Sequence, residues 1–325
     1  MKDVCIYNFY CRCPFKHGVR LEDVFIGKKI PVKILEEYKG YLLFPIKERK
    51  SNQQLLLSPY LREPDMEELD SNIRCGRFSF SDLPEGKIKL HPCFTSVCFL
   101  LDVVDVSDNK ISISILSEIE KNTSKFIKCV SLLRPSAIAW SLARDEEYVE
   151  AIATAYRRKR TNVKQWTQLL LLDPYGEQKS DTLSVEEFWY IYKNLHKEIT
   201  LQSELLADAY QCFMRSEYRE TVLNCATIIE QTLKEQIRKY LDESQTQGNI
   251  MNVIMDSVDG YGKIVKTMKK LGIPTANCNE IQKRTIELRN KVIHGGQFPK
   301  KGEAEQAISD ARLIMEQYNV SLFID

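Results

Sequence analysis

One short stretch near the C-terminus combines residue types that can cleave a phosphodiester. Arg289, Asn290 and His294 lie within six residues, and Gly295 and Gly296 follow directly. Arginine carries a permanent positive charge, and its forked donors fit phosphate oxygens. Histidine is the side chain best suited to move protons near neutral pH. Together these are the groups that RNA cleavage requires when no metal takes part, and we expect no cofactor.

Basic residues gather around this stretch, although the net charge of the whole chain is only +1 and creates no global field toward nucleic acid. Only Glu280 and Glu287 oppose the cations between positions 263 and 301. The ten cations are Lys263, Lys266, Lys269, Lys270, Lys283, Arg284, Arg289, Lys291, Lys300 and Lys301. An anionic substrate would favour this arrangement, and we expect Lys283 and Lys291 to bind it. A solvated helix face is the alternative, and it stays open.

Length and composition are those of an ordinary soluble protein with room for two domains. The 325 residues are 43% hydrophobic and 28% charged. No apolar run approaches the roughly 20 residues that cross a bilayer, so we expect no membrane partner. The N-terminus carries Asp3 and has no apolar core, so we expect no secretory signal. Ten cysteines without such a signal indicate reduced thiols and a cytoplasmic protein.

The first 130 or so residues favour β-strands. Short β-rich runs cover residues 24–26, 30–34, 41–46 and 97–106. Ile111, Ile113 and Ile115 alternate with serines, which predicts a half-buried strand joined to the previous one by a hairpin turn at 107–110. The charged segment 47–73 is expected to be an exposed loop.

From about Ser136 the pattern becomes helical. Helices are expected at 146–171, 184–199, 201–214, 217–241, 262–271, 278–294 and 303–318. Ser184 and Glu187 have the spacing of a capping box. Gly272 and the pair Gly295-Gly296 are expected to end two of the helices. The sequence therefore predicts an α+β protein: a β-rich domain of unknown role at 1–135, a helical connector at 136–199 and a helical bundle at 200–325.

Arg289 and Glu230 each lie in the apolar sector of a predicted helix. On a helical wheel, Arg289 lies between two apolar stripes, which are Ile281, Thr285, Leu288 and Val292 on one side and Ile286 and Ile293 on the other. Glu230 lies among Val222, Ala226, Ile229, Leu233, Ile237 and Tyr240, which form a stripe that Leu223 and Leu241 extend. Buried charges need partners, so we expect the two to approach, in a pair whose loss costs about 3–5 kcal/mol. Arg289 is then either wholly structural or oriented toward a phosphate, and the residues alone leave both readings open.

The helical region resembles the HEPN superfamily (higher eukaryotes and prokaryotes nucleotide-binding domain). That family has an arginine, often followed by a polar residue, and a histidine four to six positions later at a helix end. Arg289, Asn290 and His294 fit this pattern with four residues between the arginine and the histidine. The helix from Tyr218 to Leu233 is similar to the long early helix of the family. The resemblance covers about 200–325 and says nothing about 1–135.

The resemblance implies a metal-independent endoribonuclease of antiphage defence or a growth-arresting toxin. His294 would be the base or acid, Arg289 would stabilise charge in the transition state, and Asn290 would orient the histidine or donate to the phosphate. Glu230 would support Arg289. The implied partners are RNA and a second copy of the chain, which brings two motifs together. There is also room for a protein inhibitor or trigger that acts through residues 1–135.

Two features of the family pattern limit what the resemblance implies. Members that a partner enzyme modifies carry tyrosine two residues after the histidine, and Gly296 stands there in this chain, which argues against such modification. Other members have lost catalysis and serve as dimerisation modules or bind nucleotide or RNA. That role is the alternative function.

Other candidate sites are weaker. Cys5, Cys11, Cys13 and His17 lack the usual Cys-x-x-Cys spacing of a zinc site, so buried thiols are favoured over a metal. His91 and His196 stand alone and are expected to be structural. The run 157–160 is basic and could touch RNA, but a solvated helix face is the favoured interpretation.

Overall fold

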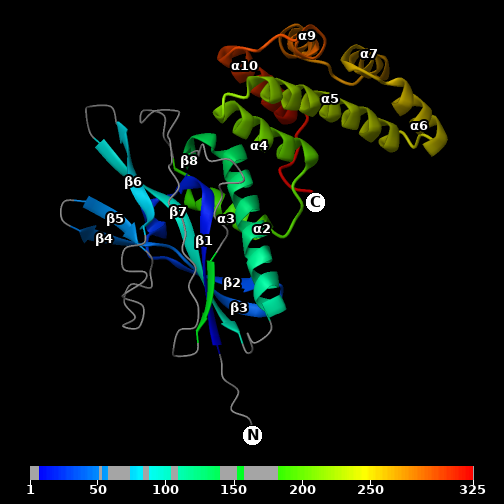
Figure 1. Cartoon of the computed structure of the whole chain (residues 1–325). Helices are drawn as coiled ribbons and strands as arrows, with labels where there is room; N and C mark the ends of the chain where they lie inside the picture. Colours follow the sequence, from blue (N-terminus) through cyan, green and yellow to red (C-terminus); the bar gives the residue numbers. More distant parts are fainter. Residues whose placement is uncertain are drawn as a thin grey trace. The chain divides into compact units, whose positions relative to one another are not determined.

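The computed structural model describes residues 7–50, 53–57, 74–82, 88–103, 109–139, 152–156 and 182–324. The chain divides into two compact units, Met1–His196 and Lys197–Asp325 (Figure 1). The first contains an antiparallel sheet with helices and the second contains helices, which confirms the α+β class. The expected connector at 136–199 contains strand and helix, and its described part up to His196 belongs to the first unit.

The sheet of the N-terminal unit is built around one long strand. Its strands are β1 (Tyr7–Arg20), β2 (Lys29–Ile34), β3 (Tyr38–Leu43), β4 (Ile46–Lys50), β5 (Gln53–Leu57), β6 (Arg74–Asp82), β7 (Ile88–Val103), β8 (Ile138–Ala139) and β9 (Ile152–Tyr156). The order β2-β3-β7-β6-β5-β4 runs through β7, and β1 pairs with β7, β8 and β9. A Cβ atom at Gly40 would lie 2.0 Å from the carbonyl oxygen of Leu100, so only glycine lets β3 approach β7 this closely.

The predicted strands were partly correct. Residues 30–34 lie in β2 as expected. Residues 24–26 do not form a strand, because a 3-10 turn (Asp23–Phe25) buries Phe25 there. The segment 47–73, expected to be a loop, contributes to β4 and β5 as far as it is described. Likewise, β9 pairs with β1 where a helix was expected across 152–156; residues 157–181, including the basic run, lie outside the described residues.

The predicted hairpin at 107–115 is wrong, because α2 (Asn109–Leu133) is a helix. Five alternating residues fit a strand, but the buried positions that follow are spaced as in a helix. They include Ile115, Ile119, Thr123, Ile127 and Val130. Ile113, which a half-buried strand would place inside, is 64% exposed. This helix packs against β1 and β2 and covers one face of the sheet (Figure 1).

The next helix, α3 (Val185–Asn194), begins at the predicted capping box. The Ser184 hydroxyl accepts a hydrogen bond from the Glu187 backbone N–H at 3.2 Å, and the Glu187 carboxylate accepts one from the Ser184 N–H at 2.9 Å. Arg134 donates to the same carboxylate at 2.7 Å. The box therefore also ties α3 to the end of α2.

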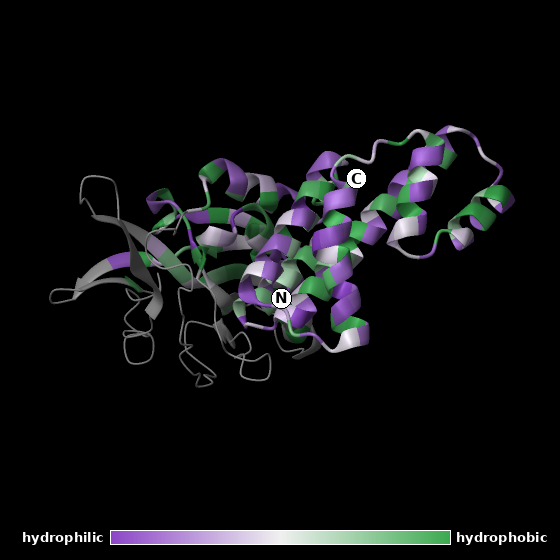
Figure 2. Cartoon of the chain, turned by 90° about the horizontal axis from the view of Figure 1, so that it is seen from above, coloured by the Kyte–Doolittle hydropathy of each residue, from purple (hydrophilic) through white to green (hydrophobic). Residues whose placement is uncertain are grey.

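The regular structure of the described part of the C-terminal unit is mainly helical. The helices are α4 (Leu201–Met214), α5 (Tyr218–Glu243), α6 (Gly248–Ser257), α7 (Tyr261–Leu271), α8 (Cys278–Ile281), α9 (Glu287–Gly295) and α10 (Lys301–Gln317). The long α5 packs against α4, α10, α7 and α9, and hydrophobic and hydrophilic residues alternate around these helices (Figure 2). The predicted stripe of α5 is buried except at Leu223 and at Tyr240, which is 39% exposed.

One helix of this unit, α6, was not predicted. It has no buried residue and exposes Ile250 and Val253. Among the residues that the structure describes, no helix has the length and apolar character to cross a membrane.

Candidate active site

The Arg/His motif lies at the end of a nearly continuous helical stretch. It runs through α8, a π-helical turn (Gln282–Ile286) and α9. The Tyr261 hydroxyl donates a hydrogen bond of 2.8 Å to the Cys278 carbonyl and thereby holds the start of α8. A π turn contains one extra residue, and such insertions are frequent at functional sites. The predicted stripe of Ile281, Thr285, Leu288 and Val292 is nevertheless buried across this turn.

Asp310 anchors this π turn to α10. Its side chain is 1% exposed and accepts hydrogen bonds from Arg284 at 2.7 Å, from the Thr285 hydroxyl at 2.7 Å and from Gln306 at 3.0 Å. Sequence reasoning missed it, although the signal was present. Asp310 falls on the apolar face of α10 near Ala307 and is therefore a buried charge that needs partners.

The predicted approach of Arg289 and Glu230 is confirmed. The Arg289 Nη2 atom lies 3.7 Å from Glu230 Oε2, and their side chains are 32% and 18% exposed. The pair is therefore only half-buried, and its loss is worth about 1 kcal/mol rather than the larger value expected for a buried pair. The second apolar stripe also ends early, since Ile286 is buried but Ile293 is 45% exposed.

Asn290 makes its hydrogen bond to Arg289, because its Oδ1 atom accepts from Arg289 Nη1 at 3.0 Å. A guanidinium has five donors. Within the described residues, this hydrogen bond and the Glu230 ion pair are its polar contacts, so its other donors have no partner there. The arrangement orients Arg289 from two sides and leaves it able to bind an anion.

His294 lies exposed in the last turn of α9. It comes four residues after Asn290, so the two side chains share one face of the helix. Gly296 ends the helix with φ of 63°, in the left-handed region that favours glycine. In the described part of the chain, the imidazole has no hydrogen-bond partner, and the proposed contact from Asn290 is not made in this single chain.

The surroundings of the motif are positively charged. Lys283 and Lys291 are exposed and, among the described residues, have no ion-pair partner. Glu280, one of the two acidic residues of this segment, lies 3.5 Å from Arg284. Its charge is therefore offset locally, and an excess of cations remains beside the motif.

The cysteine-rich N-terminal segment is described only in part. Cys5 and the side chains of Cys11 and His17 lie outside the described residues, as does the side chain of His91. Cys13 is buried, and its thiol donates to the Thr123 hydroxyl at 3.4 Å. Burial raises the pKa of Cys13 to about 12, which disfavours the thiolate that a metal would need. Within the described ranges no group of three candidate metal ligands comes together.

The end of α9 combines the oriented Arg289 guanidinium, the Asn290 amide and the solvent-exposed His294 imidazole, with exposed lysines nearby. Such a set can bind a phosphodiester and exchange protons with it. No family model matches the chain, and searches of curated proteins and of solved structures returned no match.

Proposed function

We propose that the chain is a metal-independent endoribonuclease of the HEPN type, with its active site at the end of α9. One observation carries the proposal. Arg289 is oriented by Glu230 and Asn290 on an open helix end, one turn before the exposed His294. The basic residues Lys283 and Lys291 would hold the RNA backbone beside it.

The reaction follows from the groups present. His294 would take the proton of a ribose 2′-hydroxyl, whose oxygen attacks the adjacent phosphorus, or would give a proton to the departing 5′-oxygen. The products are a 2′,3′-cyclic phosphate and a 5′-hydroxyl. Arg289 would stabilise the negative charge that accumulates on the phosphate oxygens in the transition state.

One imidazole cannot readily serve as base and acid in the same step, so the proposal includes a homodimer. Two apolar side chains beside His294 support it, since Ile293 is 45% and Phe298 81% exposed. A second copy related by a two-fold axis would cover these side chains and bring two His294 rings together. Sedimentation should show a wild-type dimer and a shift toward monomer for Phe298→Ser. A monomeric wild-type protein would contradict this part of the proposal.

The biological setting of this proposal is a cytoplasmic nuclease that acts in antiphage defence or arrests growth. The N-terminal unit would then sense a trigger or restrain the nuclease. A protein inhibitor or trigger would be an additional partner.

A second function is favoured by one observation. In this single chain no described residue orients the His294 imidazole, and Asn290 contacts Arg289 instead. A catalytically silent helical module that dimerises or binds nucleotide or RNA needs no oriented imidazole. This is the alternative to the enzyme.

The discriminating experiment is RNA cleavage in excess EDTA. We expect the wild type to cleave, and His294→Ala and Arg289→Ala to lose roughly 100- to 10,000-fold in rate. The matched control is Lys239→Ala, which removes an exposed cation from α5, away from the motif. Equal inertness of all four proteins, or equal cleavage by them, would support the binding module.

A further inference from the structure

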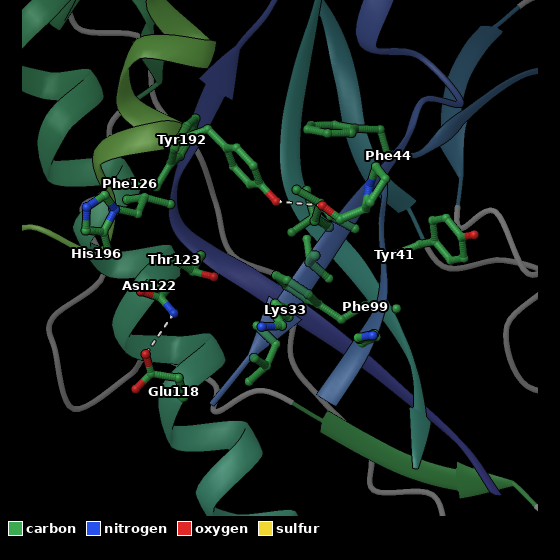
Figure 3. Close-up of a pocket in the computed structure, with 18 of the residues that line it drawn as sticks. Lys33, Tyr41, Phe44, Phe99, Glu118, Asn122, Thr123, Phe126, Tyr192 and His196 are labelled. Carbon is green, nitrogen blue, oxygen red and sulfur yellow. Dashed lines mark hydrogen bonds between the residues drawn. The ribbon is translucent and has the colours of Figure 1, made fainter. Parts of the chain in front are cut away.

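A cavity of about 800 Å³ lies in the N-terminal unit, between α2 and α3 on one side and the sheet on the other (Figure 3). Pockets for small molecules occupy about 300–1,000 Å³, so this one has room for a ligand of that size. All the residues that line it belong to the N-terminal unit. It therefore shares no residue with the motif on α9.

Most of the lining is apolar and held in place by aromatic packing. Phe44, Phe126 and Phe188 contribute to it, and the Phe188 ring packs on the other two with centroid distances of 5.9 Å and 5.4 Å. Val32 lies between the buried Ile30 and Ile34 on the inner face of β2 and is itself only partly covered. The cavity therefore has an apolar wall whose aromatic rings are held by their mutual packing.

One side of the cavity offers hydrogen-bond acceptors. On α2, Asn122 donates to Glu118 at 3.1 Å, which leaves the Asn122 carbonyl oxygen and a second Glu118 oxygen for another donor (Figure 3). Two other polar groups of the lining already have partners. Thr123 accepts from Cys13, and the Tyr192 hydroxyl donates to the Pro31 carbonyl at 2.9 Å. An ionised carboxylate can only accept, so a ligand with a hydroxyl or an N–H group would match the free Glu118 oxygen.

The charges of the lining cancel. Lys33 and Lys39 are balanced by Glu36 and Glu118, and Lys33 lies 3.0 Å from Glu36. An ionised ligand would find no net opposite charge in the lining. The lining therefore complements an uncharged molecule.

The hairpin turn at the cavity has unusual backbone geometry. Leu35 and Glu36 both line the cavity and have φ values of 51° and 60°, in the left-handed region. Residues other than glycine are uncommon there, but tight hairpin turns require it, so the turn between β2 and β3 accounts for these values.

We propose that the N-terminal unit binds an uncharged, mainly apolar small molecule that carries a hydroxyl or N–H donor. Its apolar body lies between α2 and the β2–β3 hairpin, and its donor reaches Glu118 and Asn122. The proposal does not depend on ribonuclease activity and stands if the motif on α9 is inert.

The probe for a test is N-phenyl-1-naphthylamine, an uncharged apolar dye with one N–H donor whose fluorescence rises in apolar surroundings. We expect saturable binding of one dye per full-length chain. Val32→Trp fills the cavity and should abolish binding. Val24→Trp makes the same change at a 53% exposed position outside the lining and should bind as the wild type does. Absence of saturable binding, or equal binding by the two variants, overturns the proposal.

A second variant tests the polar side without filling the cavity. Asn122→Ala should weaken binding of the dye roughly threefold to tenfold, because one acceptor is lost. It should leave the N-methylated dye, which has no donor, unaffected. The anionic dye 1-anilinonaphthalene-8-sulfonate should bind the wild type more weakly than the uncharged dye. Tighter binding of the anion, or an unchanged affinity of Asn122→Ala for the N–H dye, overturns the assigned ligand chemistry.

Discussion

The two units place their polar groups in opposite ways. In the N-terminal unit, Cys13, Thr123 and Tyr192 pair with one another or with the backbone around an apolar cavity. In the C-terminal unit, the candidate site residues Arg289, Asn290 and His294 lie near the end of α9, and His294 is exposed. The first arrangement suits recognition of an uncharged molecule and the second suits a polyanion. One chain thus carries two kinds of candidate site, and each can be altered without the other.

The reactivity of two buried thiols measures how well the interior of the N-terminal unit excludes solvent. Burial raises the pKa of Cys13 and of Cys129 to about 12, from an ordinary value of 9.0. Each therefore holds roughly 1,000-fold less thiolate than an ordinary thiol at pH 8. Native protein treated with iodoacetamide should leave both unmodified by mass spectrometry, and urea should make both reactive. Rapid native labelling would mean that the interior is open.

Asp310→Ala should be the most destabilising change beside the motif. It removes the acceptor of a buried hydroxyl and of Arg284, and we expect a loss of about 2–4 kcal/mol in the free energy of unfolding of the helical unit. Urea unfolding followed by far-ultraviolet circular dichroism measures it. Glu316→Ala on the same helix is the control, because that side chain is 68% exposed and its ion pair is worth little. Similar losses for both variants would refute the anchoring role of Asp310.

Glu187 gives the N-terminal unit a pH-dependent contribution. Burial alone would raise its pKa, but hydrogen bonds from Ser184 and Arg134 outweigh burial and lower it below the ordinary 4.5. Its stabilisation is thus present above pH 4.5 and is lost as pH falls through the lowered value. Glu187→Gln should cost about 1 kcal/mol at pH 7 and progressively less below pH 4. A difference that is constant with pH would contradict this assignment.

The smallest effect expected is at Glu230. Its carboxylate orients an arginine whose side chain is 32% exposed, so Glu230→Gln should cost about 1 kcal/mol or less in stability. If the proposed function holds, the same variant should slow RNA cleavage, while Glu235→Gln, an exposed acid on the same helix, should not. Equal rates for the two variants would make Glu230 purely structural.

Sequence periodicity predicted most of the helical unit and the Glu230–Arg289 contact, because a charge within an apolar stripe needs a partner. The same reasoning applied to α10 would have found Asp310. The exposure of Ile293 was not predictable, since a helical wheel shows which residues share a face but not where the neighbouring helices stop covering that face. The segment from Ile111 to Ile115 was wrongly predicted as a strand, because five residues are too few to distinguish the two-residue period of a strand from the 3.6-residue period of a helix. The cavity could not be predicted from the sequence, since its walls come from strands and helices that lie far apart along the chain.

The most direct test of the nuclease proposal is the chemistry of the products. A short RNA is incubated with the protein in excess EDTA, beside the same RNA with 2′-deoxyribose at the nucleotide 5′ to the cleaved bond. The account predicts 2′,3′-cyclic phosphate and 5′-hydroxyl ends from the first RNA, no cleavage at the substituted position of the second, and loss of both products in His294→Ala. Cleavage of the deoxy-substituted bond, or unchanged products from His294→Ala, would contradict it.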